Sequence, residues 1–256
     1  MYHNHIYSGL CQVGIIDNKT GISSEGTSTI LFLHLLKLAK QVLARAKKRQ
    51  KAASRRNTTA ELDDLLEVYV LVAASLEAFI NDFCRHKIDE IKWTDGEAYW
   101  LKGLEEIIDQ KIEVRLKWQL VPQLLWQKAF DESQSPWQDF NVLIHLRNLL
   151  LHYKTEYLLP GKVPGPLGYI PHLLSSESQN TNKPHTLTEA LRESKTWVHR
   201  ICNLEMARWA FNTGVRMIKK FLEFADQESK AEYTLLLEAW GITLIADDRR
   251  SKRKAT

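Results

Sequence analysis

The feature that most constrains the fold of this chain is a long stretch without helix breakers. Residues 27–95 contain neither glycine nor proline, although the 256-residue chain has 11 glycines and 7 prolines. Glycine interrupts helices through its backbone entropy, and proline does so through its missing N–H and its ring. Neither kind of helix breaker therefore divides this stretch.

Apolar residues recur at helical spacing in several segments. Between residues 62 and 83 they follow steps of three and four, which place them on one face of a helix with about 3.6 residues per turn. The same spacing recurs over 201–222, and shorter helical pieces are expected at 98–120 and at 137–157, the latter opened by Pro136. Because no alternating apolar run follows residue 26, the sequence predicts an all-α, up-and-down helical bundle.

The first 26 residues have a different character. They hold four glycines and two short β-favouring pieces, at 5–7 and 13–16, and a turn-like segment follows at 17–21. We expect an irregular or β-hairpin N-terminal arm there.

The organisation of the whole chain follows from these patterns. Region 1–59 is expected to combine the arm with a basic helical segment, and the helical bundle is expected over 60–246. Five of the seven prolines fall within 160–186, which predicts an irregular loop inside the bundle. The charged end at 247–256 is expected to be disordered.

Positive charge is concentrated in two places. Nine basic and no acidic residues lie within 37–56, and five basic and no acidic residues lie within 249–254, whereas the rest of the chain has 21 basic and 31 acidic residues. Two basic patches on an acidic body indicate a polyanionic partner, although a charge run can also be a solvated helix face. The candidate RNA-binding residues of the first patch are Lys47, Lys48, Arg49, Lys51, Arg55 and Arg56.

Several classes of protein are excluded by composition. No uninterrupted apolar run approaches the 18 residues that a membrane span needs, and the N-terminus lacks the basic and then apolar pattern of a signal peptide. The three cysteines, Cys11, Cys84 and Cys202, are far apart and form no CxxC pair. We expect a reduced, cytoplasmic protein with no membrane partner.

The segment 137–157 does not have the pattern of an ordinary core helix. On a helical wheel, polar residues form one narrow stripe between two apolar sectors, and such a stripe will be partly buried and in need of hydrogen-bond partners. The stripe consists of Asn141, His145, Asn148, His152 and Glu156. Arg147 lies about 140° from His152 on an ideal wheel. Either the helix loosens near His152, or the arginine bends around, or two copies of the helix face each other.

These residues carry a resemblance to a known family. The run Arg147-Asn148-Leu149-Leu150-Leu151-His152 resembles the Arg-(polar)-x-x-x-His signature of the HEPN superfamily of helical RNA-cleaving domains. The segment 75–83, which contains Glu77, resembles the family's long first helix with its acidic residue. The resemblance covers about 60–224 and implies a bundle of four to five helices with the motif on a late helix.

The resemblance implies a metal-independent endoribonuclease that needs no cofactor, because the ribose 2′-hydroxyl of RNA is itself the nucleophile. His152 is suited to proton transfer, since an imidazole titrates near pH 6.5, and Arg147 would hold the scissile phosphate. Asn148 would orient the imidazole or bind a phosphate oxygen. The implied products are a 2′,3′-cyclic phosphate and a 5′-hydroxyl.

The family pairs its motif across a two-fold axis, which implies a homodimer with an inactive monomer. It also implies a bacterial toxin with a neutralising antitoxin partner, or an effector of antiviral defence. Glu77 and His145 are further catalytic candidates. Each also has a simpler interpretation, because Glu77 fits a solvated surface charge and His145 fits a hydrogen-bonded structural histidine.

Other readings of the sequence stay open. Arg147 fits an ordinary surface cation, and His152 fits a residue favoured by the negative end of the helix dipole. His145 and His152 are seven apart, but no acidic or cysteine residue is spaced to complete a metal site with them. The alternatives to a nuclease are a non-catalytic HEPN-like module that binds RNA, a nucleotide or a protein, and a structural scaffold whose motif is coincidental.

Overall fold

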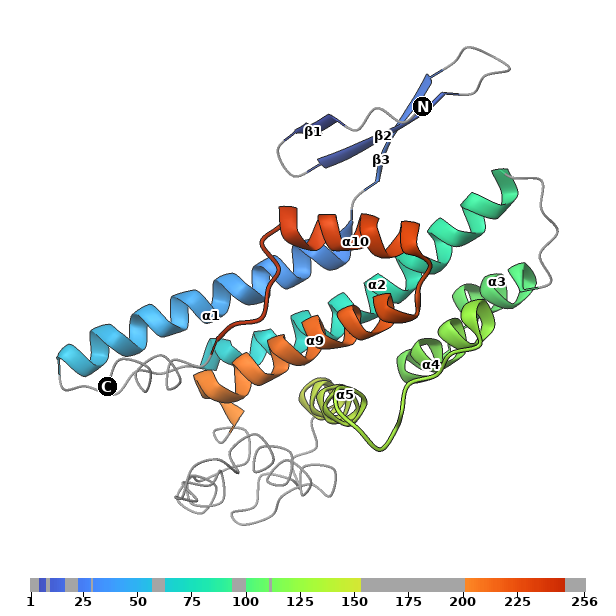
Figure 1. Cartoon of the computed structure of the whole chain (residues 1–256). Coiled ribbons are helices and arrows are strands. Elements are labelled where there is room, and N and C mark those ends of the chain that lie inside the picture. The colour runs from blue at the N-terminus through green and yellow to red at the C-terminus, as the bar shows by residue number, and fades with distance from the viewer. Residues whose placement is uncertain are drawn as a thin grey trace, which may run out of the picture.

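The protein is built mainly of helices, which confirms the predicted all-α class for its body (Figure 1). A computed structural model of the chain describes residues 5–7, 10–16, 23–28, 30–56, 63–93, 100–110, 112–152 and 201–246. The expected loop at 160–186 and the charged end at 247–256 lie outside these described residues. Among the helices described, none combines the length and the apolar character that crossing a membrane requires.

Three short strands precede the helices. β1 (His5–Tyr7) pairs antiparallel with β2 (Leu10–Ile16), which pairs antiparallel with β3 (Ser23–Ser28). The two β-favouring pieces of the sequence fall within β1 and β2. β3 is not predicted, because its sequence of serines, a glutamate, a glycine and a threonine has no alternating apolar residues.

Three long helices form the centre of the body. α1 (Leu31–Arg55), α2 (Leu66–Trp93) and α9 (Leu204–Phe224) lie side by side, and a 3-10 turn, η1 (Asp63–Leu65), leads into α2 (Figure 1). α2 and α9 confirm the helices predicted over 62–83 and 201–222. α2 continues to Trp93, close to the end of the stretch without glycine and proline.

α1 belongs to the same body as α2 and α9. Its buried residues form one face, and they share a core with the buried faces of the other two helices. The helical body therefore begins at Ile30, whereas the sequence suggested a boundary near residue 60, because the basic residues of 37–56 obscure the apolar positions among them. The buried residues of α1 are Phe32, Leu33, Leu36, Ala39, Val42, Leu43 and Ala46.

α2 and α9 approach each other closely at Gly214. A Cβ atom at this position would lie 2.5 Å from the Cγ1 atom of Val72, nearer than two carbon atoms can pack. Gly214 and Val72 are both buried. The glycine therefore sets how near the two helices lie, at a cost in helix propensity.

The segment 98–120 forms two helices instead of one. α3 (Leu101–Asp109) ends where Gln110 is extended, and α4 (Val114–Trp126) runs back along it, so that Gly103 lies against Leu124. The apolar spacing continues in phase across the break, which is why the sequence did not reveal it. Reversal of the chain allows Trp118 to enter the core, where its Nε1–H donates to the Leu76 carbonyl at 3.3 Å.

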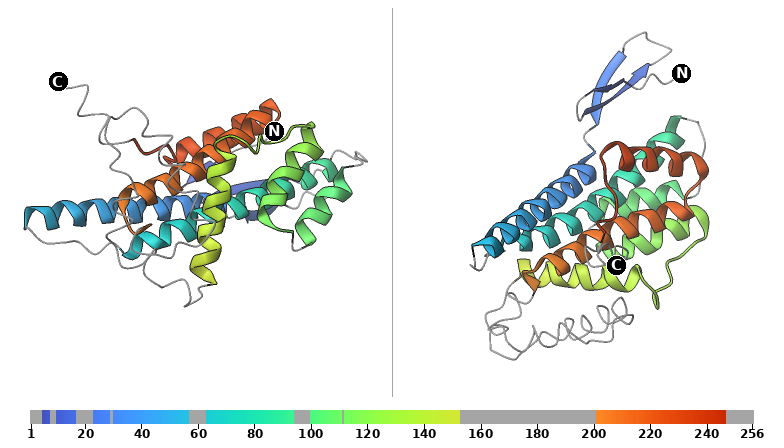
Figure 2. Two further views of the ribbon diagram at one scale, coloured as in Figure 1. Left: turned by 90° about the horizontal axis from the view of Figure 1, so that it is seen from below. Right: turned by 60° about the vertical axis from the view of Figure 1, so that its left-hand side comes forward.

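α5 (Trp137–Leu151) crosses the long helices steeply instead of running along them. Figure 1 shows it end-on, while α1, α2 and α9 are seen lengthwise, and the left view of Figure 2 shows it lying across them. The helix opens at Pro136, as predicted. The arrangement therefore departs from a simple up-and-down bundle. A reason is that buried residues occur on several sides of α5, so that it packs against both α2 and α9.

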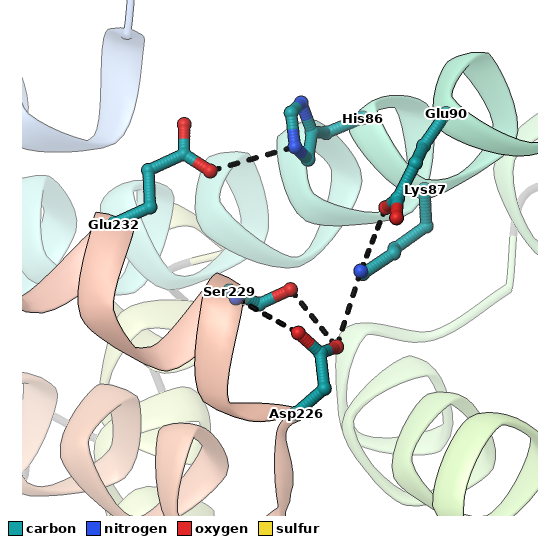
Figure 3. A network of polar contacts seen from close by, with 6 residues as sticks. All are labelled: His86, Lys87, Glu90, Asp226, Ser229 and Glu232. Carbon is teal, nitrogen blue, oxygen red and sulfur yellow. Dashed lines mark hydrogen bonds and ion pairs between the residues drawn. The ribbon is translucent and has the colours of Figure 1, made fainter. Parts of the chain in front are cut away.

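α10 (Gln227–Ala239) was not predicted, and polar contacts fasten it to α2 (Figure 3). The Asp226 side chain caps the helix by accepting from the Ser229 backbone N–H at 2.8 Å. The same carboxylate lies 3.1 Å from the ammonium of Lys87, which also donates to Glu90 at 2.7 Å. These contacts place the start of α10 against α2.

The chain after α10 returns across the helices. The Trp240 ring packs edge-on against His34 and beneath the Lys37 ammonium, and Lys40 donates to the Gly241 carbonyl at 2.5 Å. Further on, the Asn212 amide pairs with the backbone of Ile245, accepting from its N–H at 2.9 Å and donating to its C=O at 3.1 Å. Residues 240–246 are thereby fixed to α1 and α9.

The close approach at Gly214 generates a stability prediction. Gly214→Ala is expected to lower the free energy of unfolding by about 1 to 3 kcal/mol through overpacking, although the helix propensity of alanine offsets up to about 1 kcal/mol. Chemical denaturation measures this loss. In a Val72→Ala background the same substitution should cost clearly less, because the clashing methyl group is gone, and an equal cost in both backgrounds would contradict the packing argument.

The Asp226 cap generates a pH prediction. Burial acts to raise the Asp226 pKa, but hydrogen bonds from Ser229 and Lys87 and the charge of Lys87 prevail, so that its pKa is lowered. A carboxyl group whose pKa is lowered by folding stabilises the folded state at pH values above its ordinary pKa. This stabilisation is lost as the pH falls through the folded-state pKa. Asp226→Ala is expected to cost about 0.5 to 2 kcal/mol at pH 7 and clearly less near pH 3.

Denaturant unfolding at both pH values checks this expectation. Asp226→Asn serves as the matched variant, because its amide oxygen still accepts from Ser229 while the charge facing Lys87 is removed, and its loss should be smaller than that of alanine. A loss from Asp226→Ala that does not depend on pH would show that the carboxylate charge contributes nothing.

Candidate functional site

The signature residues lie where α5 emerges from the packed body. Every residue from Val142 to Ile144 is buried, as is Leu146, whereas the residues from Arg147 to Leu150 are half-buried. Leu151 is 50% exposed, and His152 is exposed. The first three turns of α5 therefore anchor the helix, and its last turn presents side chains at the surface.

A buried carboxylate anchors the start of α5. Asp139 in the first turn accepts from the Ser135 hydroxyl at 2.7 Å and from the Trp209 indole N–H at 3.3 Å, and a guanidinium nitrogen of Arg216 lies 3.9 Å away. A carboxylate in this position is also favoured by the positive end of the helix dipole. Asp139 thus ties α5 to α9.

Arg147 and Asn148 are joined directly. The Arg147 Nη1 atom donates to the Asn148 side-chain oxygen at 2.9 Å, and both residues are half-buried. The long arginine side chain therefore bends toward the polar stripe, although its Cα lies on another side of the helix. This contact matches one of the three arrangements expected from the helical wheel, namely that the arginine side chain bends around the helix.

His152 is the residue at which α5 ends. Its backbone has φ −111° and ψ 48°, which is not helical, while its N–H still donates to the Asn148 carbonyl at 2.8 Å. The helix thus loosens at His152, which is a second arrangement left open by the sequence. Within residues 112–152, no side-chain hydrogen bond joins His152 to Arg147. The pairing of two copies of the motif stays a prediction.

His145 is held by a residue of α4. Its Nε2 atom lies 3.3 Å from Nη1 of Arg115, and because a guanidinium only donates, the imidazole accepts there in its neutral form. Arg115 is in turn held by Glu113, whose carboxylate lies 2.5 Å from its Nη2 atom. Burial and the charge of Arg115 lower the pKa of His145, although Glu113 opposes this. These contacts favour the structural interpretation of His145.

Glu77 lies on the exposed side of α2, between the buried residues Leu76 and Ala78. In the part of the chain that the structure describes, no hydrogen bond or ion pair links Glu77 to the last turn of α5. This environment fits a solvated charge.

The basic residues of 47–56 lie at the end of α1, and nearly all of them are exposed. Lys48, Lys51, Arg55 and Arg56 are exposed, and Lys47 is half-buried. Arg49 differs from them because its guanidinium is in an ion pair with Asp64. The predicted patch is therefore present at the surface, but it is not uniform.

No metal centre emerges from the side chains that the structure describes. Among them, no three His, Cys, Asp or Glu residues are grouped closely enough to hold an ion. Burial raises the pKa of the Cys84 thiol to about 12 and that of Cys202 to about 11, with Asp63 adding to the effect at Cys202. Raised thiol pKa values are typical of unreactive cysteines.

Two residues of this region were missed by sequence reasoning. Arg115 is 30 positions from its partner His145, and Asp139 is 70 positions from Trp209. Neither pairing produces a local pattern. The sequence indicated only that a half-buried histidine needs a hydrogen-bond partner, and it did not identify which residue that partner is.

Comparison with known proteins gives no family for this chain. No protein-family model matches it, and neither a curated protein nor a solved structure is significantly similar to it.

The contact between Arg115 and His145 generates a further prediction. Arg115→Ala removes one of the two causes that lower the His145 pKa, so the pKa is expected to rise toward its ordinary value. The imidazole resonances of His145 in an NMR pH titration report this change. Lys128→Ala, which removes an exposed cation elsewhere, should leave the titration unchanged. An unaltered His145 titration in Arg115→Ala would contradict the contact.

Proposed function

We propose that this chain is a metal-independent endoribonuclease whose site consists of Arg147, Asn148 and His152. The observation that carries the proposal is the arrangement of the last turn of α5. There Asn148 holds the Arg147 guanidinium at 2.9 Å, and an exposed His152 ends the helix one turn after Asn148. A cation and an imidazole at the surface are the groups that cleavage of RNA requires.

The proposed reaction is an attack by the ribose 2′-oxygen on the adjacent phosphorus. The 2′-hydroxyl gives its proton to an imidazole as the new oxygen–phosphorus bond forms. The bond from phosphorus to the 5′-oxygen breaks, and that oxygen receives a proton. Arg147 would offset the negative charge that grows on the phosphoryl oxygens, and the products are a 2′,3′-cyclic phosphate and a 5′-hydroxyl.

The reaction needs a base on one side of the phosphorus and an acid on the other. One His152 cannot occupy both positions at once, so we propose a homodimer in which two copies of the α5 end share one cleft. Asn148 would act as a positioning residue for Arg147. Neither Glu77 nor His145 is assigned a role, because Glu77 is an exposed charge of α2 and His145 is held by Arg115.

A cytoplasmic toxin with a neutralising antitoxin, or an effector of antiviral defence, is a setting proposed from the HEPN resemblance alone. A second candidate function is a non-catalytic HEPN-like module that binds RNA. The exposed cations at the end of α1 favour this candidate, because they would attract phosphates without cleaving RNA.

Cleavage of labelled RNA in the presence of EDTA tests the proposal. Arg147→Ala and His152→Ala are each expected to reduce the rate by about 100-fold or more, the range that general acid–base groups contribute. Mass spectrometry should identify the cyclic phosphate in the wild-type product. Lys128→Ala is the control for loss of a surface cation. Full cleavage by both variants would refute the assignment, and RNA binding without any cyclic phosphate would favour the non-catalytic module.

Adding increasing amounts of the His152→Ala variant to a fixed amount of the wild-type protein tests the shared cleft. A heterodimer of the two contains one intact His152, so its cleft lacks either the base or the acid. The cleavage rate is expected to fall as the variant is added if two copies complete one site, and a rate that does not change on mixing would contradict the dimer.

A further inference from the structure

The last part of α1 projects beyond the packed body. Its final buried residue is Ala46, and the helix continues for nine residues to Arg55, a length of about 14 Å at 1.5 Å per residue. Figure 1 and the left view of Figure 2 both show α1 extending past the neighbouring ribbons. This projecting end therefore gains little from apolar packing.

The cations of the projecting end are not distributed evenly around the helix. Lys48, Lys51 and Arg55 fall within about 60° on a helical wheel of 100° per residue, and all three are exposed. Arg49 and Arg56 lie on a different side, where Arg49 is engaged by Asp64. We define the basic stripe as Lys48, Lys51 and Arg55.

The basic stripe has a clear limit toward the start of α1. Lys37 and Lys40 fall on the same side of the helix, but Lys37 lies 5.1 Å from the centre of the Trp240 ring, and Lys40 donates to the Gly241 carbonyl. The segment that follows α10 thus occupies the first part of this side. Among the residues that the structure describes, Lys48, Lys51 and Arg55 of the projecting part remain exposed on this side.

The basic stripe is unfavourable for the isolated helix. Its members are three and four residues apart, and like charges at these spacings destabilise a helix. No acidic residue within 37–56 relieves this repulsion. A polyanion bound along the stripe would remove it.

We propose that the basic stripe binds the phosphate backbone of single-stranded RNA, at a surface separate from the signature residues of α5. Successive cations are about 4.5 to 6 Å apart along the axis, a spacing similar to that of successive phosphates in an extended strand. The segment 47–56 contains no aromatic residue, so bases do not stack there and binding does not depend on their sequence. The choice of RNA among polyanions rests on the proposed function.

Fluorescence polarisation of a labelled 2′-O-methyl RNA, which cannot be cleaved by 2′-hydroxyl attack, tests the inference with the full chain. The variant Lys48→Gln/Lys51→Gln/Arg55→Gln removes the stripe and retains good helix formers. For single strands, the slope of log affinity against log salt is about −0.7 per phosphate contact, so the variant should lose about 2 units of slope. Its affinity at low salt should fall at least tenfold.

The matched control is Lys102→Gln/Lys128→Gln/Lys230→Gln, which removes three exposed cations from other parts of the surface. It should retain the wild-type slope, and circular dichroism should confirm that both variants are folded. Equal slopes in the stripe variant and the wild type would overturn the proposal. It would also be overturned if the stripe were needed for binding heparin or phosphatidylserine vesicles but not RNA.

The experiment separates this inference from the proposed nuclease. If the wild type cleaves no RNA but binds the 2′-O-methyl strand through the stripe, the nuclease proposal fails and the stripe inference stands. If cleavage requires Arg147 and His152 while the stripe variant binds and cleaves normally, the stripe inference fails alone.

Discussion

The ring of Phe79 on α2 is the contact on which the arrangement of the helices depends. It packs against Phe32 of α1, Trp118 of α4, Phe221 of α9 and Tyr233 of α10, with ring centroids 5.2 to 5.6 Å apart. One side chain thus relates four helices to α2. Trp118 extends the contact to Phe140 of α5 at 5.7 Å, so the helix that carries the signature residues is positioned through the same aromatic centre.

α5 combines a fixed beginning with an exposed end. Phe140 and Asp139 hold its first turn by packing and by hydrogen bonds, whereas Arg147 and His152 lie after the last buried residue, Leu146. The buried residues of α5 and the residues available to a substrate therefore lie in different parts of the same helix. The same separation occurs in α1, where packing ends at Ala46 and charge continues beyond it. In both helices the residues proposed to meet RNA contribute little to the core.

Local patterns in the sequence predicted the helices that bury one continuous apolar face. The remaining features depend on contacts between residues that are far apart in the chain. α2 and α9 have an uninterrupted apolar face, so their spacing was sufficient. The break between α3 and α4 leaves that spacing in phase, and it depends on Trp118 reaching the core. In the candidate site, the polar stripe and its need for partners followed from the sequence, but the identity of Arg115 as the partner of His145 depends on how α4 and α5 pack.

The clamp formed by Asn212 recognises main-chain atoms, because its two hydrogen bonds are made with the N–H and the C=O of Ile245. Such recognition places no demand on the chemical identity of the neighbouring Thr243 and Leu244, which are exposed, while Ile242 is buried as the apolar anchor. A fluorophore or an affinity handle introduced at Thr243 would therefore sit at a defined place on the surface. Its attachment would leave the aromatic centre intact.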